Sequence, residues 1–303
     1  MRQIRTDLAM ESVGDAGAIP GVEVNHWENA GVYVTEVVIT DQKSAVRLGK
    51  PIGNYITLES QAVKKRDVDA RLGMAAMIGE EIARMIGDVG EKSVMVVGLG
   101  NRMITPDSLG PLTVDRTLVT RHIFTELSQY ADERMRSVCA VAPGVLGVTG
   151  IETAEMLESI VMRVDPACIV VVDALAARAT GRIGAAVQIA DTGIQPGSGV
   201  GNHRAALTRE KLGVPVVAVG MPTVIYAATL ARDAFEAVSK SGDSEEALSQ
   251  LERELMDSTG GDMIVTPREI DELIKDSAGM IAAGINRALQ PQLSDSEILA
   301  MMD

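Results

Sequence analysis

The amino-acid sequence predicts an α/β fold: a doubly wound, mostly parallel sheet with helices on both faces. Two observations indicate this class. Short aliphatic runs rich in β-branched residues alternate with amphipathic helical segments, and each run ends in a loop that holds Gly, Pro or Asp. Of the 303 residues, 46% are hydrophobic but only 2% are aromatic, so the expected core is aliphatic, which suits parallel strands packed between helices.

The first part of the chain is expected to form an arm, a small sheet and one long helix. Residues 1–19 lack strong periodicity, which predicts a loosely held arm. Residues 32–40 and 55–58 have strand composition, and we expect them to form a small additional antiparallel sheet beside the main one. Residues 67–86 are expected to form an amphipathic helix, because apolar side chains recur every three or four positions at Val68, Leu72, Ala75, Ile78, Ile82 and Met85.

The chain is organised around the stretch 94–115, where an apolar strand leads into a glycine turn. Residues 94–97 are an uninterrupted β-branched and aliphatic run, as in a parallel strand covered on both faces. Gly98 and Gly100 then allow the backbone to turn sharply and leave room for a group close by. Open α/β sheets bind their ligands at such carboxyl ends of strands, so we look for site residues here.

Two aspartates are predicted at strand ends of this sheet. Thr105 and Pro106 indicate a helix start, with Thr as the N-cap, and Asp107 falls in the first turn. Asp173 directly follows the apolar run 167–172. In one crevice the two carboxylates would form a pair that activates water for hydrolysis. The alternative is that Asp107 complements a helix dipole and that Asp173 caps the next helix.

The later elements continue the alternation of strands and helices. We predict a strand at 138–141, a helix at 151–164, a strand at 185–189, a last core strand at 214–219, a charged surface excursion at 241–261, and a helix at 270–285 that starts from a capping box at 266–269. Residues 193–201 hold four glycines and are expected to form a loop. Gly197, Gly199 and Gly201 are candidates for pairing with a substrate backbone, and a plain connection is the alternative.

Composition excludes several functional classes. The 28 Lys and Arg against 42 Asp and Glu give a net charge of −14, which argues against direct nucleic-acid binding. No apolar run resembles a signal peptide or is long enough to span a bilayer, so we expect a soluble intracellular protein without a membrane partner. Cys139 and Cys168 lie in predicted buried strands, as free thiols do in a reducing cytoplasm.

Other catalytic and cofactor motifs are missing from the sequence. Neither glycine segment is a G-x-G-x-x-G, and the chain has no Walker lysine, so a nucleotide cofactor is not expected. His26, His122 and His203 lack metal-ligand spacing, and no G-x-S-x-G supplies a serine nucleophile. We therefore expect no metal ligands and no cofactor, and the aspartates remain the candidate catalytic residues.

Eight segments of the sequence together form a specific signature. They run through nearly the whole chain: RTDLAMES at Arg5, YITLES at Tyr55, VGLGNRMITPDSLGP at Val97, VTRHIF at Val119, APGVLGVTGIET at Ala142, VDALAAR at Val172, DTGIQPGSGVGN at Asp191 and VTPREID at Val265. With these segments, the chain resembles the germination protease family of spore-forming bacteria, endopeptidases that degrade small acid-soluble spore proteins.

The resemblance implies an aspartic-type peptidase of unusual fold, similar to the fold of hydrogenase-maturation peptidases. The catalytic aspartates of the family fall on Asp107 and Asp173. The family is made as a zymogen that shortens its own N-terminus, and the processing point falls on the bond between Asp7 and Leu8. This implies a propeptide at 1–7 and a single peptidase domain at 8–303.

The resemblance also implies a cellular setting. The enzyme would initiate degradation of small acid-soluble spore proteins during spore germination, after being made in sporulation. It would be a homotetramer in the cytoplasm of the forespore and the spore core.

A mechanism follows from two carboxylates in one crevice. Two carboxylates held close together cannot both ionise easily, so the pKa of one should rise. The ionised aspartate would act as general base on a water, while the protonated aspartate polarises the scissile carbonyl. Residues 1–7 would block the crevice in the zymogen. The alternatives are a metal-dependent peptidase of the hydrogenase-maturation type and a non-catalytic binding protein with this fold.

Overall fold

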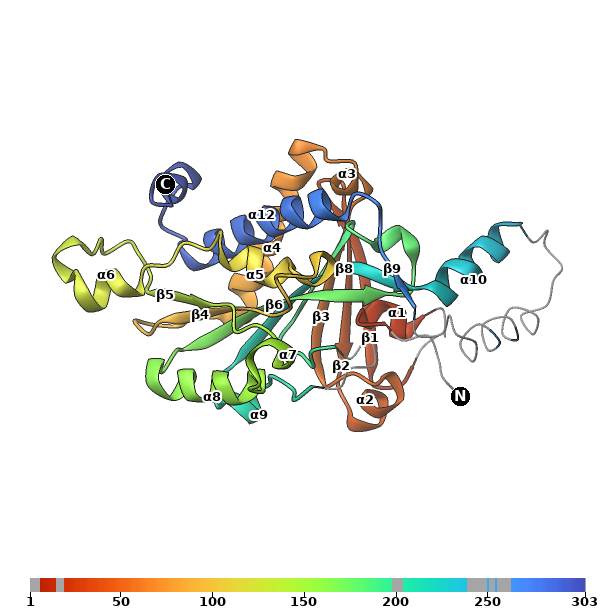
Figure 1. Ribbon diagram of the computed structural model, residues 1–303, viewed down its shortest axis with the longest axis horizontal. Coiled ribbons are helices and arrows are strands. Elements are labelled where there is room, and N and C mark those ends of the chain that lie inside the picture. The colour runs from red at the N-terminus through yellow and green to blue at the C-terminus, as the bar shows by residue number, and fades with distance from the viewer. Residues whose placement is uncertain are drawn as a thin grey trace.

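The computed structural model describes residues 6–14, 19–197, 204–238, 250, 254 and 263–302. Its centre is a nine-stranded sheet in the order β1-β2-β3-β7-β8-β6-β4-β5, with β9 paired to β8 (Figure 1). The strands are β1 Val22–Asn29, β2 Val32–Ile39, β3 Gly53–Glu59, β4 Val94–Gly98, β5 Val138–Val141, β6 Cys168–Ala177, β7 Ala186–Ala190, β8 Val216–Tyr226 and β9 Ile264–Val265.

The sheet has a parallel half and an antiparallel half. The strands β5, β4, β6 and β8 pair successively in parallel register. The strands β1, β2, β3, β7 and β8 pair successively in antiparallel register, so β8 belongs to both halves. The predicted α/β fold class is confirmed. The antiparallel strands are not a separate sheet, however, because β7 pairs with both β3 and β8 and so joins the two halves.

Helices cover both faces of the sheet (Figure 1). The helices α4, α5 and α12 lie on one face, and α8 and α9 lie on the other. The helices are α1 Ala9–Val13, α2 Gln42–Leu48, α3 Gln61–Lys64, α4 Val68–Ile86, α5 Leu109–Val114, α6 Arg121–Glu126, α7 Leu146–Thr149, α8 Thr153–Val164, α9 Arg209–Leu212, α10 Ala227–Val238, α12 Ile270–Leu289 and α13 Asp295–Ala300, with 3-10 helices η1 Thr105–Asp107, η2 Ser128–Tyr130 and η3 Thr180–Arg182.

The position of β6 between two layers of helices explains why the first part of its sequence is an unbroken apolar run. Val170 packs into the core under α4 and α12, while its neighbours Ile169 and Val171 pack into the core under α8 and α9. Successive side chains of a strand point to opposite faces, and both faces are covered here. The central strands therefore need aliphatic residues at every position.

Three predicted details of the elements can be compared directly with the structure. The 67–86 helix is confirmed as α4, and the side chain of Asp67 caps it by accepting a hydrogen bond from Ala70 N at 2.8 Å. The capping box at 266–269 is wrong, because Thr266 Oγ1 donates instead to Thr223 O at 2.9 Å and α12 begins without a side-chain cap. The 241–261 excursion lies outside the described residues except for Gln250 and Glu254.

Candidate active site

The candidate site lies where β4 stops and β6 continues. β4 ends at Gly98, opposite Val172, and Leu99 N donates to Val172 O at 2.8 Å as the last link between the two segments. β6 runs on to Ala177 and remains paired with β8. Asp173 is thus the first residue past the end of β4. The prediction that it ends its own strand is wrong, because pairing with β8 extends β6 beyond the apolar run.

Asp107 is fixed by the turn that follows β4. Its carboxylate oxygen Oδ2 accepts a hydrogen bond from Asn101 N at 2.8 Å. Gly100 has a φ of +112°, and a Cβ there would lie 2.0 Å from Asp107 O, so the turn needs glycine at this position. Thr105 is not an N-cap as predicted, since it lies inside η1, and α5 begins afterwards at Leu109.

A second glycine contact holds this turn against the sheet. A Cβ on Gly98 would lie 2.2 Å from Gly110 O, in the first turn of α5. Only two residues without side chains can approach so closely. The start of α5, and with it the η1 turn that carries Asp107, therefore packs directly on the end of β4.

One cavity of about 300 Å³ joins the two aspartates. Asp107 and Asp173 both line it, and so does Asp7 from the N-terminal segment. Arg204 and Glu152 also line it, with 3.8 Å between Arg204 Nη1 and Glu152 Oε2. The structure thus places the two predicted catalytic residues and the first residue of the predicted processing bond around one space.

The electrostatics of the cavity favour a shared proton. Burial raises the pKa of Asp173 well above its ordinary value, and the nearby charges of Asp107 and Asp7 raise it further, against one hydrogen bond from Ala174 N at 2.9 Å. Burial also raises the pKa of Asp107, and the hydrogen bond from Asn101 N opposes this. The arrangement can therefore supply both a protonated and an ionised carboxyl group.

The N-terminal segment is bound along the part of β6 that extends past β4. Asp7 N donates to Ala176 O at 2.9 Å, and Ala176 N donates to Asp7 Oδ2 at 2.9 Å. Leu8 is fully buried in a cluster whose other buried members are Leu175, Ala177, Ile183 and Ile225. The prediction of a loosely held arm is wrong for residues 6–14, because this segment completes the sheet edge and a small core.

The carbonyl group of Asp7 is held by two side chains. Lys50 Nζ donates to Asp7 O at 2.8 Å and to Thr6 O at 3.2 Å. Gln188 Nε2 donates to Asp7 O at 3.1 Å, and Gln188 Oε1 accepts from Ala9 N at 2.7 Å. Sequence reasoning missed both Lys50 and Gln188. The only signal was one polar residue in the apolar strand AVQIA.

A buried carboxylate anchors the helix α1 just after this bond. Glu11 is only 6% exposed and accepts hydrogen bonds from Arg178 N at 2.7 Å, Ala179 N at 3.0 Å and Arg182 Nη1 at 2.8 Å. A buried charge is stable only with partners of this kind. Glu11 therefore anchors the segment after the predicted processing bond, and Thr6 Oγ1, on the other side of that bond, donates to the same carboxylate.

One of the three candidate glycines of the loop at 193–201 lies at the candidate site. Gly197 lines the cavity with its neighbour Pro196. Gly199 and Gly201 lie outside the described residues. Among the residues that the structure describes, no group of three or more His, Cys, Asp or Glu side chains is arranged to hold a metal ion.

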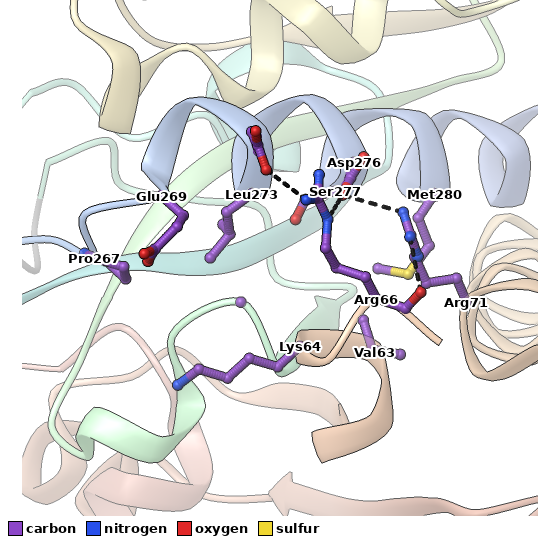
Figure 2. Close-up of a pocket in the computed structure, with 12 residues that line it drawn as sticks. Val63, Lys64, Arg66, Arg71, Pro267, Glu269, Leu273, Asp276, Ser277 and Met280 are labelled. Carbon is purple, nitrogen blue, oxygen red and sulfur yellow. Dashed lines mark hydrogen bonds and ion pairs between the residues drawn. The ribbon is translucent and has the colours of Figure 1, made fainter. Parts of the chain in front are cut away.

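A second cavity, of about 260 Å³, lies between the α3–α4 segment and α12 (Figure 2). Figure 2 shows Arg66 reaching across it to two acidic side chains of α12, with Arg66 Nε 2.7 Å from Asp276 Oδ2 and a further bond to Glu272. Arg71 Nη1 also lies 3.2 Å from Asp276 Oδ2. Because these charges already pair across the cavity and neither candidate catalytic aspartate lines it, this space is separate from the candidate site.

Comparison with known proteins places the chain in a family. The family model described as germination protease matches residues 2–243 and 237–301. The germination protease of Caldanaerobacter subterraneus subsp. tengcongensis is 42% identical over 97% of each chain, and that of Clostridium acetobutylicum is 41% identical over 98% of each chain.

One solved structure shows a weak similarity. The [NiFe] hydrogenase maturation protease HycI from Thermococcus kodakarensis KOD1 is 18% identical, with a TM-score of 0.33 over 68% of this chain and 98% of that chain. A similarity at this level carries no argument about the site. Within the described residues, no helix is both long enough and apolar enough to pass through a bilayer. The family match and the full-length relatives decide the identification: the chain belongs to the germination protease family of peptidases.

Proposed function

We propose that the protein is an endopeptidase in which Asp107 and Asp173 activate a water molecule, and that it is made as a zymogen that cleaves its own bond between Asp7 and Leu8. The observation that carries this proposal is the single cavity lined by all three aspartates. An acid and a base of matched pKa near one peptide bond are what hydrolysis by water requires.

In the proposed reaction, the ionised member of the pair removes a proton from a water, whose oxygen attacks the carbonyl carbon of Asp7. The protonated member polarises the carbonyl and then gives its proton to the nitrogen of Leu8 as the carbon–nitrogen bond breaks. The products are a carboxylate on Asp7 and an amine on Leu8. The raised pKa of Asp173 and its deep burial make it the better candidate for the protonated member.

We further propose that the substrates are small acid-soluble spore proteins and that the enzyme initiates their degradation during germination. The support is membership of the germination protease family. In this proposal the enzyme is a homotetramer in the forespore and spore core, acts without a cofactor, and has its cavity occupied by residues 1–7 until they are removed. The contacts of Asp7 along β6 support this last point.

The test is intact mass spectrometry of the full chain over time at mildly acidic pH, with and without a chelator. We expect the wild type to lose residues 1–7 in either buffer, and Asp107→Asn and Asp173→Asn to lose them at least about 100-fold more slowly, the usual size of an acid–base contribution. Asp165→Asn is the matched control, because Asp165 pairs with Lys92 on the surface. Cleavage in all variants would contradict the aspartate mechanism, and cleavage that stops with the chelator would favour a metal-dependent peptidase.

A further inference from the structure

We propose that Lys50 and Gln188 are catalytic residues that stabilise the negative charge which develops on the carbonyl oxygen of Asp7 during cleavage of the bond to Leu8. This inference rests on the proposed self-cleavage and adds two donors to the carbonyl oxygen that the protonated aspartate polarises. An aspartate pair handles the protons of the reaction. The oxygen of the tetrahedral intermediate still needs donors that are in place before the reaction begins.

The contacts already converge on the reacting oxygen. Lys50 Nζ lies 2.8 Å and Gln188 Nε2 lies 3.1 Å from Asp7 O. These distances fall in or near the range expected for donors of an oxyanion site. One donor is an ammonium group, which binds a developing anion more strongly than a neutral carbonyl oxygen.

The orientation of the Gln188 amide is fixed by its other end. Its Oε1 accepts a hydrogen bond from Ala9 N at 2.7 Å, on the far side of Leu8. The flipped amide would place its oxygen against Asp7 O and its NH₂ against the N–H of Ala9, so only one orientation satisfies both partners. The amide therefore spans the bond to be cut and presents its N–H to the correct oxygen.

The sheet register brings this amide and the carboxyl group of Asp173 to one face. Gln188 of β7 and Asp173 of β6 both pair with Gly220 of the intervening strand β8. Residues directly opposite one another in a sheet direct their side chains to the same face. A carboxyl group and an amide from strands on either side of β8 therefore point toward the same segment of chain.

The charge of Lys50 suits this position. Burial lowers the pKa of its ammonium group, while the charges of Asp7 and Glu11 oppose that effect. A cation partly removed from water interacts more strongly with a developing oxyanion than an exposed lysine does. The alternative is a clamp that binds the segment equally well before and during the reaction, and such a clamp would not accelerate cleavage.

In the step concerned, the water oxygen forms a bond to the carbonyl carbon of Asp7, and the π electrons of the carbonyl move onto its oxygen. Lys50 and Gln188 stabilise that oxygen without giving up a proton. The electron pair then re-forms the carbonyl as the bond to Leu8 N breaks, and Leu8 N takes the proton from the aspartate pair. Atoms, protons and electrons balance without a further reactant.

The experiment measures two quantities on the full chain. The first is the rate constant for loss of residues 1–7 by intact mass. The second is hydrogen exchange at Ala9 N–H, which reports whether the segment is docked. We compare Lys50→Met, Lys50→Arg and Gln188→Glu with the control Lys92→Met, whose lysine is 58% exposed. Gln188→Glu keeps the acceptor for Ala9 N–H but places an oxygen, not a donor, against Asp7 O.

We expect Lys50→Met to slow cleavage about 100- to 1000-fold, as loss of one oxyanion donor does, with Ala9 N–H still protected. Lys50→Arg should recover part of the rate because it restores a cation. Gln188→Glu should also slow cleavage with the segment docked, and it tests the assignment if Lys50→Met does not fold. Slower cleavage together with lost protection would overturn the assignment in favour of a clamp, as would an unchanged rate in both variants.

The two proposals fail in different ways. If Asp173→Asn still cleaves, the aspartate mechanism is wrong, and if the wild type does not cleave at all, the proposed self-cleavage is wrong; in either case the assignment of Lys50 and Gln188 falls with it. If Asp173→Asn stops cleavage while Lys50→Met and Gln188→Glu cleave at the wild-type rate, the aspartate mechanism stands and only the oxyanion assignment is wrong.

Discussion

At the residue scale, Asp173 occupies a position where a charge is costly. It is 6% exposed and lies in the interior of β6, with a single backbone N–H as its described hydrogen-bond donor. Two further aspartates, Asp107 and Asp7, add like charge. A side chain that served only to stabilise the fold would be apolar here, as Val171 and Val172 are, and the unfavourable burial of a carboxyl group is consistent with the proposed chemical role.

Because a charge on Asp173 is unfavourable in the folded protein, the free energy of unfolding should depend on pH. The folded protein keeps a proton on Asp173 at pH values where the unfolded chain, with a pKa of about 3.9, has lost it. The free energy of unfolding therefore falls as the pH rises above that value toward the raised folded pKa. Asp173→Asn cannot ionise, so we expect it to be more stable than the wild type by roughly 1–3 kcal/mol at neutral pH, and by much less near pH 4.

Urea unfolding at both pH values measures this difference, with the surface variant Asp165→Asn as control. A stability difference that does not change with pH would mean that the pKa of Asp173 is not raised in the folded protein.

At the element scale, the sequence predicts those features that a local pattern encodes. The apolar runs of β4 and β6 and the periodicity of α4 all predict elements that the structure contains. β1 was not predicted, because its sequence VEVNHWEN packs neither face into the core and so lacks a clear alternation. The extension of β8 through Pro222 was also missed, since a proline and a register shift opposite it hide the strand.

The residues of the candidate site also fall into two groups, those that a local sequence pattern indicates and those that it does not. Asp107 and Asp173 follow apolar runs, so sequence position alone indicates them. Lys50 and Gln188 meet Asp7 only through the packing of segments about 43 and 181 residues away, as their separations show. Residue spacing along the sequence does not encode contacts between such distant segments. For this reason the sequence indicated Asp107 and Asp173 but not Lys50 and Gln188.

The docking of the helix α1 on the rest of the protein can be tested by substituting Glu11, the residue that anchors it. Glu11→Ala leaves the N–H groups of Arg178 and Ala179 without their acceptor, and leaves the guanidinium of Arg182 with only one of its two carboxylate partners, Glu59. We expect a loss of about 3–5 kcal/mol in unfolding free energy, typical of a broken buried ion pair, and faster proteolysis within residues 6–14. Thermal unfolding and limited proteolysis measure these effects, with the exposed Glu91→Ala as control. An unchanged proteolysis rate would show that Leu8 and the sheet bonds hold the segment without Glu11.

At the scale of the whole molecule, the strand β1 is an exposed edge of the sheet. It pairs only with β2 among the described strands, and seven of its eight residues are exposed. Val24 is 38% and Trp27 is 41% exposed, and the ring of His26 stacks on that of Tyr33 at 5.8 Å. An open strand edge with apolar side chains invites pairing with another chain.

We therefore expect β1 to contribute an interface of the proposed homotetramer. Val24→Glu and Trp27→Glu should each shift the protein to smaller species in sedimentation velocity, because they place charge in that contact. Met162→Glu is the control, since Met162 is 80% exposed on α8, which packs against the parallel half of the sheet. A tetramer that persists in both β1 variants would place the interfaces elsewhere.

Under the proposed self-cleavage, the bond lies between two unequal sets of contacts, and this would make activation a one-way step. Before cleavage, residues 1–7 are tethered to the site, and a tethered ligand competes as though present at about millimolar concentration. After cleavage, that advantage disappears, and the released peptide keeps only the bonds made by residues such as Thr6 and Asp7. Leu8 and Glu11 stay with the enzyme. Dilution would then drive the peptide away, while the new N-terminus would stay anchored in the same buried cluster as Leu175, which lines the cavity.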